Sequence, residues 1–223
     1  MSCQPVFYKI LNKHGIHNGY RYSQGLNILN GPFNNNPYQS CAPGGFYITT
    51  KEHLHKYLHY GVWIVEVYLP TWLPGFEIVP DPQGDKWRVN MLILGRRFHI
   101  FQMNMYLGVG LDVTKFIDHP TFVPLACKQG RTDVLTWIKC SSCYQFNAQQ
   151  IKYIADLPMV PPNVLEWFKL NIPNNVNFDL FICLAIRNWS TATALWLWNN
   201  RNLIYSSNFR QLYDYLKRMY ILQ

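Results

Sequence analysis

The sequence lacks the marks of secreted and membrane-spanning proteins. Residues 1–15 contain no apolar run behind a basic start, so they do not resemble a secretory signal. No stretch approaches the roughly 18–20 apolar residues that cross a bilayer. The most apolar window, 62–73, is interrupted by Glu66 and Pro70. We therefore expect a soluble intracellular protein with no membrane partner.

Charge is also scarce, since only 14% of the 223 residues are charged and only 12 are acidic. The chain has no glycine-rich phosphate loop, no nucleophile elbow and no dinucleotide fingerprint. No pair of carboxylates stands out for acid–base catalysis. Hydrophobic residues make up 49% of the chain, so it can bury enough apolar surface to fold. These features predict a folded protein that is not an enzyme and needs no cofactor.

Cysteine and histidine are too sparse to build a metal site. Six cysteines are spread over a chain large enough to fold without disulfides, so we expect mostly reduced thiols. Cys140 and Cys143 form a single close pair, whereas a structural zinc site needs four ligands. His55 and His59 are four residues apart but lack the glutamate of a metalloprotease motif. No metal is expected.

The formal net charge is nevertheless +8, because 20 Lys and Arg outnumber the acids. The excess is spread evenly, with ten basic against seven acidic residues in 1–118 and ten against five in 119–223. Alternation in a strand over 87–94 places Lys86 and Arg88 on the face opposite Trp87. Such a charge permits nonspecific attraction to nucleic acid. The candidate basic surface comprises Lys86, Arg88, Arg96, Arg97, Arg210, Lys217 and Arg218.

The first half has the composition of short strands joined by turns. A turn over 12–19 and a long loop over 30–45 are rich in Asn, Gly and Pro. A helix capped by Thr49 or Thr50 should place Leu54 and Leu58 on one apolar face. We predict an α+β leading domain over 1–118. Its strands are expected over 5–11, 20–29, 46–49, 62–69 and 87–94.

The second half contains a repeat of about 30 residues. Similar apolar segments begin at Val134, Val164 and Ala194, and a small residue precedes each, at Ala126, Ala155 and Ala185. Such a period predicts stacked helical hairpins, because one unit cannot bury its apolar face alone. We therefore predict a helical array over 119–223, closed by a capping helix over 209–222 and packed with the leading domain as one unit. Trp137, Trp167 and Trp196 are expected in its core.

The first copy of this repeat resembles the ankyrin motif. Its segment 125–130 places Ala126 and Cys127 where that family has paired alanines, and Gly130 where it has the hairpin glycine. The second copy keeps only part of the pattern, and the third has Trp189 in place of the glycine. These segments resemble degenerate ankyrin repeats, and ankyrin arrays bind proteins through a concave surface.

The first half carries a resemblance of its own. A series of motifs in order is similar to the leading domain of ankyrin-repeat proteins of giant amoebal DNA viruses, the mimivirus and marseillevirus relatives. The resemblance implies a non-catalytic protein that binds a host or viral protein, in the host cytoplasm or nucleus or packaged in the virion. Nonspecific nucleic-acid binding is the alternative. The motifs are Gly25–Ile28, Pro43–Thr49, Tyr60–Trp63, Glu66–Pro70, Asp81–Arg88 and Ile93–Gly95.

Three segments of the same half are similar to the His-Gly, Gly-Leu and Gly-x-Tyr-Phe series of poly(ADP-ribose) polymerases: His14-Gly15, Gly25-Leu26 and Gly45–Thr49. In that family the histidine and tyrosine hold the nicotinamide ribose and ring, and a later glutamate polarises the ribose. Here no glutamate has that context, so the resemblance implies an ADP-ribosyltransferase-like fold without activity. We expect His14 on an exposed turn, and Tyr47 packed against the helix that carries Leu54 rather than beside a carboxylate in one pocket.

Overall fold

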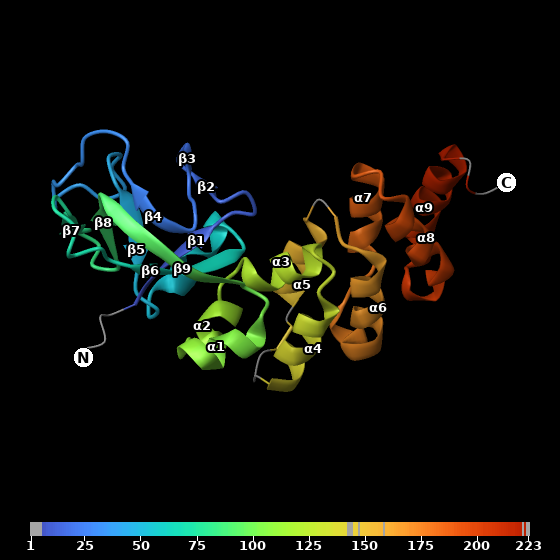
Figure 1. Ribbon diagram of the computed structural model, residues 1–223. Helices are drawn as coiled ribbons and strands as arrows, with labels where there is room; N and C mark the ends of the chain where they lie inside the picture. The colour runs from blue at the N-terminus through green and yellow to red at the C-terminus, as the bar shows by residue number, and fades with distance from the viewer. Residues whose placement is uncertain (1–5, 142–144, 147, 158, 220, 222–223) are drawn as a thin grey trace. The chain divides into compact units, whose positions relative to one another are not determined.

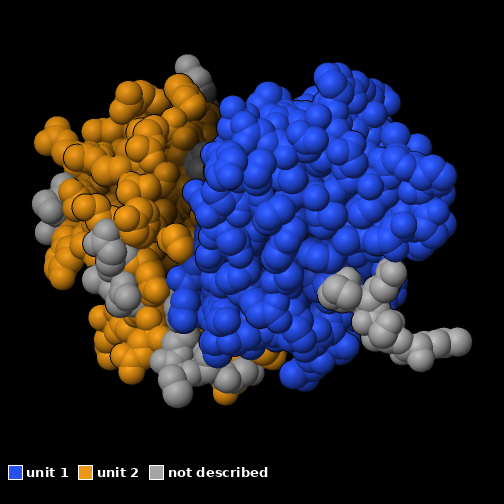
Figure 2. Space-filling view, turned by 90° about the vertical axis from the view of Figure 1, so that its left-hand side faces the viewer, with its two compact units in different colours: residues 1–119 blue, residues 120–223 orange. Residues whose placement is uncertain are grey.

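The computed structural model describes residues 6–141, 145–146, 148–157, 159–219 and 221. The chain forms two compact units, residues 1–119 and 120–223, which are coloured separately in Figure 2. The first unit is built on a β-sheet and the second on helices (Figure 1). The predicted α+β class, a strand-rich first part followed by a helical ankyrin-like array, is confirmed.

The first unit contains a seven-stranded antiparallel sheet in the order β4-β9-β6-β1-β5-β8-β7. A separate two-stranded hairpin, β2-β3, pairs Ile16 with Arg21 and His17 with Tyr20. The strands are β1 Phe7–Leu11, β2 Ile16–His17, β3 Tyr20–Arg21, β4 Gly25–Ile28, β5 Phe46–Thr49, β6 Trp63–Tyr68, β7 Ile78–Pro80, β8 Lys86–Val89 and β9 Met91–His99.

Strand β1 lies at the centre of this sheet, and all five of its residues are buried. One sheet face carries a core of alternate apolar residues from β1, β5, β6, β8 and β9, as the period of two predicts. Because both faces of β1 are covered, its sequence is a nearly continuous apolar run rather than an alternating one. The only charged residue in that run is Lys9.

The helices of the first unit are short. The helix expected after Thr49 is a 3₁₀ helix, η1 (Leu54–Tyr60), and it begins without a side-chain cap, so the predicted threonine cap is wrong. Its apolar face is as expected, since Leu54 and Leu58 are both buried. The expected strand over 20–29 is also divided, into β3 and β4. Two α-helices follow the sheet, α1 (Met103–Val109) and α2 (Val113–Ile117).

The second unit consists of helical hairpins followed by one further helix, and its described residues contain no strand. The first helices of successive hairpins contact one another, and so do the second helices, which gives two layers of stacked helices. The last helix, α9, contacts both helices of the preceding hairpin, as a cap must. The helices are α3 Phe122–Lys128, α4 Thr132–Ser141, α5 Ala148–Ala155, α6 Pro162–Asn171, η2 Pro173–Asn175, α7 Leu180–Arg187, α8 Thr191–Asn199, η3 Arg201–Leu203 and α9 Ser206–Arg218.

The repeat period is 30 residues in the first step and 29 in the second. In α6, Val164, Leu165 and Phe168 are buried, and the same pattern in α8 falls on Thr193, Ala194 and Leu197. The third copy therefore begins one residue earlier than the sequence pattern predicted. The three small residues that precede the repeated segments are buried: Ala126, Ala155 and Ala185.

The tryptophans of the array are less buried than the sequence predicted. Trp167 is buried, whereas Trp137 and Trp196 are partly exposed.

Within the described part of the chain, no helix is both long and apolar enough to cross a bilayer.

Candidate functional site: a pocket in the sheet and a row of hairpin turns

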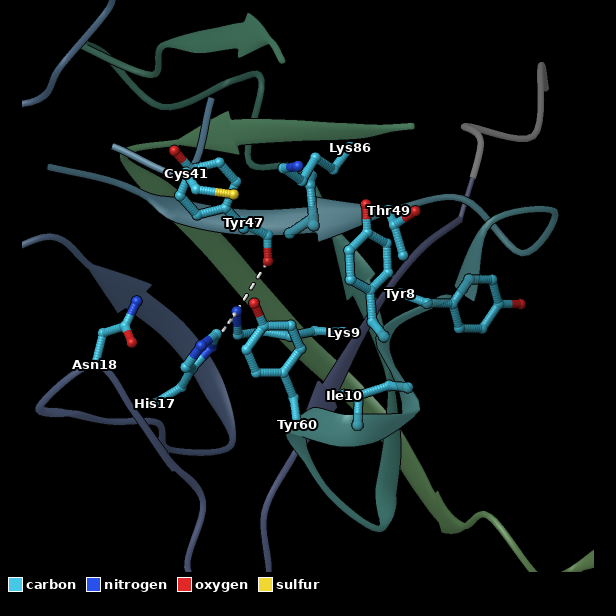
Figure 3. Close-up of a pocket in the computed structure, with 12 residues that line it drawn as sticks. Tyr8, Lys9, Ile10, His17, Asn18, Cys41, Tyr47, Thr49, Tyr60 and Lys86 are labelled. Atoms are coloured by element: carbon cyan, nitrogen blue, oxygen red, sulfur yellow. Dashed lines mark hydrogen bonds between the residues drawn. The ribbon is translucent and has the colours of Figure 1, made fainter. Parts of the chain in front are cut away.

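A pocket opens in the first unit where strands β1 and β5 separate. The two strands are paired at Tyr8 and Thr49, and the register does not continue toward Ile10 and Tyr47. The gap has an empty volume of about 570 Å³, part of which is open solvent. Figure 3 shows its lining: Tyr8, Lys9, Ile10, His17, Asn18, Cys41, Tyr47, Ile48, Thr49, Tyr57, Tyr60 and Lys86.

Lys9 is the central charged group of this pocket. The residue is only 4% exposed, and its ammonium donates a hydrogen bond to the Tyr47 carbonyl oxygen at 2.8 Å. That carbonyl lies where β5 is no longer paired with β1, so the lysine replaces a missing backbone donor. The Nζ atom also lies 4.9 Å from the centre of the Tyr22 ring. No carboxylate within the described ranges forms an ion pair with Lys9.

Burial lowers the pKa of Lys9 to about 7, because a charged ammonium loses its hydration there and gains no anion in return. Its neighbour is His17 of the β2-β3 hairpin, whose Nδ1 lies 3.5 Å from Nζ. Burial, together with the Lys9 charge, lowers the pKa of His17 to about 4. The imidazole is therefore neutral at neutral pH and can accept a hydrogen bond from the ammonium.

Aromatic side chains form much of the remaining wall. Tyr47 lines the pocket from β5, with its carbonyl oxygen directed at Lys9 and its ring on the side of Cys41 (Figure 3). Tyr57 and Tyr60 come from η1. The Tyr60 ring contacts His17, with centroids 4.7 Å apart. Burial, and next the Asp85 carboxylate, raise the pKa of Tyr57, so this phenol stays protonated. The pocket is an apolar slot with a few polar groups aimed into it, the usual form of a small-molecule site.

Lys86 lies at the opposite side of the pocket from His17 (Figure 3), and unlike Lys9 it has acidic neighbours. Its ammonium lies 3.4 Å from Asp81 and 3.8 Å from Asp85. Although burial acts in the other direction, these carboxylates raise its pKa. Lys56 also pairs with Asp85, at 3.0 Å. The charge of Lys86 is thus offset by carboxylates of the same unit, and the residue has a structural role.

Lys86 and Arg88 were predicted on a basic surface, and for both the structure contradicts this, since they are 6% and 1% exposed. The loop over 30–45 packs over their face of the sheet and supplies acceptors. The Arg88 guanidinium donates to the Asn36 carbonyl at 2.6 Å and to the Tyr47 hydroxyl at 3.0 Å. Gly45 permits this approach, because a Cβ there would lie 2.2 Å from Arg88 Cγ.

The other five basic candidates are exposed, but they belong to two separate units. Arg96 forms a two-bond ion pair with Glu66 at 2.7 and 3.0 Å, and Arg97 lies over the Trp63 ring. The rest lie on α9, at Arg210, Lys217 and Arg218.

The sequence analysis did not single out Lys9, the central residue of the pocket. The available signal was a lysine enclosed by bulky apolar residues within a strand.

The other candidate ligands do not come together. His55 and His59 lie on a 3₁₀ helix, where residues four apart point in different directions. Cys140 is an exposed free thiol, while Cys143 and Cys3 lie outside the described residues. In the part of the chain that the structure describes, no three His, Cys, Asp or Glu side chains form a metal-binding group.

The residues of the ADP-ribosyltransferase resemblance separate in the same way. His14 is exposed on its turn, as expected, and does not line the pocket. Tyr47 does line it, with its hydroxyl donating to the Ala42 carbonyl at 2.9 Å. No carboxylate belongs to the described lining. The histidine, tyrosine and acid of that mechanism therefore do not converge here.

A second feature lies on the array, at the turns inside its hairpins. Gly130 and Trp189 occupy equivalent turns with left-handed backbones, at φ 67° and 54°. The surrounding hydrogen bonds also match: the next residue's N–H donates to the carbonyl of Ala126 or Ala185. Met159 lies in the longer connection between α5 and α6, the turn of the hairpin between these two. Trp189 is 72% exposed and Met159 51%, so successive turns present large apolar side chains.

Hydrogen bonds link each repeat to the next in matching positions. The Trp167 indole donates to the Thr136 hydroxyl at 2.8 Å, and the Trp196 indole donates to Glu166 at 3.0 Å. Lys139 likewise donates to the Asn171 carbonyl, and Lys169 to the Asn200 side chain. These bonds hold the hairpins in register, so their turns form a row.

Comparisons with known proteins agree with this architecture. No protein-family model matches the chain. No solved structure matches it either. Ankyrin repeat protein R868 of Acanthamoeba polyphaga mimivirus is 48% identical over 90 residues, which cover 40% of this chain and 45% of that protein. Ankyrin repeat protein R229 of the same virus is 38% identical over 128 residues, which cover 50% and 41%.

The uncharacterized protein R869 of that virus is 36% identical over 111 residues, which cover 48% of this chain and 80% of R869. This chain spans less than half the length of R868 and R229. The similarity to R869 extends over most of that relative. The chain therefore belongs to the same family as R869, and it is similar to ankyrin repeat proteins of the same giant virus.

Proposed function

We propose that this protein is a non-catalytic interaction protein that binds a host or viral protein during infection, through the turns of its helical array. Ankyrin-repeat relatives in a giant virus support a protein-interaction role. The observation that carries the proposal is Trp189, a 72% exposed tryptophan at a position where its hairpin turn favours glycine. A bulky residue with positive φ is strained, and such strain concentrates at functional sites.

Trp189 has the properties of a binding hot spot. Tryptophan is enriched among the residues that dominate protein–protein binding energy. Met159 continues the same row of turns, and methionine adapts to the shape of an apolar partner. We expect the partner to present a complementary apolar patch to this row.

The test is affinity capture from infected cells followed by binding measurements with the purified partner. We compare the wild-type protein with Trp189→Gly, which removes the side chain but suits the left-handed backbone. Trp72→Gly is the matched control, because Trp72 is 66% exposed but lies in the first unit. Loss of a hot spot should weaken binding by about 30-fold, which corresponds to ~2 kcal/mol.

Trp72→Gly should retain wild-type affinity. If Trp189→Gly captures the same proteins with unchanged affinity, the turns of the array are not the interface. Affinity that depends steeply on salt would instead favour the nucleic-acid alternative.

A further inference from the structure

The buried cations of the first unit differ in their ion-pair and hydrogen-bond partners. Lys86 has two carboxylates within 4 Å, and Arg88 donates to carbonyl and hydroxyl oxygens. Lys9 is as deeply buried as Lys86, yet the structure gives it a single carbonyl, one imidazole nitrogen and a ring face. A buried ammonium without an anion is costly. The fold therefore holds at Lys9 an amine that is only partly protonated near neutral pH and that a bound anion would hold in its charged form.

The position of Lys9 shows what could supply that charge. Its Nζ lies inside a pocket, at the point where the central strands separate, and Figure 3 shows it between His17, Tyr60 and the Tyr47 carbonyl. A second hollow is lined by His17, Asn18, Cys41 and Tyr47 as well, so the open space continues beyond the first pocket. A small molecule can thus reach the ammonium.

The side chains that line the pocket indicate the chemistry of the rest of the ligand. Tyr47, Tyr57 and Tyr60 present aromatic surface to the pocket, and aromatic rings prefer to stack on or meet flat groups edge to face. The described lining contains no carboxylate that would repel an anion.

We propose that the Lys9 pocket binds a small, flat organic acid, an aromatic ring with one carboxylate or phosphate, whose acidic group pairs with the Lys9 ammonium while its ring lies among Tyr47, Tyr57 and Tyr60. This site is separate from the row of turns proposed to bind a protein. The two proposals can fail independently.

Binding at this site is coupled to a proton. The titratable groups around Lys9 are His17, with His59 beyond it, then Tyr22, and in the pocket lining Tyr8, Cys41, Tyr47, the tyrosines of η1 and Lys86. The carboxylates beside the pocket, Asp81 and Asp85, pair with Lys86 and Lys56 rather than with Lys9. With the pKa of Lys9 at about 7, an anion at Nζ favours the protonated form, so the protein takes up a proton when the acid binds.

The experiment follows the ε-carbon resonance of Lys9 by NMR in the full chain, as pH is varied. The probes are benzoate, phenyl phosphate, inorganic phosphate and the neutral analogue benzyl alcohol, each at ~10 mM. We expect benzoate or phenyl phosphate to raise the midpoint of the Lys9 titration by about one pH unit or more. Benzyl alcohol should leave it unchanged.

Calorimetry with the better acid supplies the second readout. Lys9→Met keeps the length of the side chain without its charge and should weaken binding at least ~10-fold, as loss of a charge-assisted contact does. Lys51→Met removes an exposed lysine outside the pocket and should bind normally.

Three results would overturn the proposal. The first is a Lys9 titration that neither aromatic acid moves. The second is Lys9→Met binding as tightly as the wild type. The third is inorganic phosphate acting as strongly as phenyl phosphate, which would remove the aromatic part of the assignment.

Discussion

Lys9 and Arg88 are buried cations on different strands of one sheet, and each is held by backbone carbonyl oxygens. The guanidinium of Arg88 is solvated by several acceptors, among them the Asn36 carbonyl and the Tyr47 hydroxyl. Lys9 can lose its proton, and burial lowers its pKa to about 7. A single substitution at Lys9 therefore changes both the charge of the pocket and the pH dependence of stability.

The Lys9 shift predicts how stability depends on pH. Below pH 7 the Lys9 proton is bound in both the folded and the unfolded state, so Lys9 does not make the free energy of unfolding depend on pH there. Between about pH 7 and pH 10 the unfolded chain still holds it while the folded protein does not, and stability therefore rises with pH. The gain is up to about 1.4 kcal/mol per pH unit. Urea unfolding at pH 7 and pH 9 should show this rise in the wild type and not in Lys9→Met.

The matched control is Lys51→Met, because Lys51 is exposed and its substitution should leave the wild-type pH slope intact. The comparison is between slopes, so a uniform change in stability from the new methionine does not affect it. Equal slopes in the wild type and Lys9→Met would show that Lys9 has an ordinary pKa.

At the scale of single elements, the hairpin turns of the array show one backbone shape with two different residues. Gly130 meets the requirement for positive φ at little cost, whereas Trp189 adopts it against the preference of its side chain. The two turns make equivalent hydrogen bonds. Placing glycine at position 189 and a residue with a side chain at position 130 should therefore change the free energy of unfolding in opposite directions.

We expect Trp189→Gly to raise the free energy of unfolding by about 1 kcal/mol, since relief of the left-handed strain exceeds the entropy that glycine adds to the unfolded chain. Gly130→Ala should lower it by about 1 kcal/mol. At Gly130 the added Cβ would also lie 3.3 Å from the Asn163 side chain. Chemical denaturation of both variants provides the measurement.

Lower stability in Trp189→Gly would mean that the ring contact with Tyr215, at 6.4 Å, outweighs the strain. Higher stability together with lost partner binding would instead separate the two roles of this residue. In that case Trp189 is retained for binding at the expense of stability.

Local sequence patterns predicted those parts of the fold that depend on local chemistry. The strand at Phe46–Thr49 and the strand Trp63–Tyr68 follow directly from β-prone residues bounded by glycine and proline. Trp189 could be assigned to a glycine position, because the hairpin repeats its surroundings. The one-residue shift in the third repeat could not be predicted from the sequence. Trp196 and Trp198 fit the apolar pattern equally well, and only their burial in the structure distinguishes them.

The errors at the candidate site have a different cause, because they depend on distant contacts. Lys86 and Arg88 alternate with apolar residues as an exposed strand face would, but the loop over 30–45 covers that face. Lys9 becomes central only where β1 separates from β5, and no local pattern specifies that separation. The pocket thus required the tertiary structure, whereas the array was readable from its period.

For the molecule as a whole, the remaining question is whether its charge of +8 serves nucleic-acid binding. Lys86 and Arg88 are buried, and Arg96 is exposed but paired with Glu66, so the candidates that remain are Arg97 and the three residues of α9. Such a distribution supports general attraction to polyanions better than a built binding surface.

We predict weak binding to duplexes of unrelated sequence, with a dissociation constant on the order of 10⁻⁶ M or weaker at ~150 mM salt. Fluorescence anisotropy from ~50 to ~200 mM salt measures it. Replacing Arg210, Lys217 and Arg218 together by glutamine should weaken the low-salt binding no more than replacing three other exposed cations of the same unit, Lys128, Lys152 and Arg187. Both triple variants lose the same charge, so equal effects indicate attraction by net charge alone. Submicromolar binding at ~200 mM salt that only the α9 variant abolishes would instead identify a nucleic-acid interface on that helix and contradict the proposed protein-binding role.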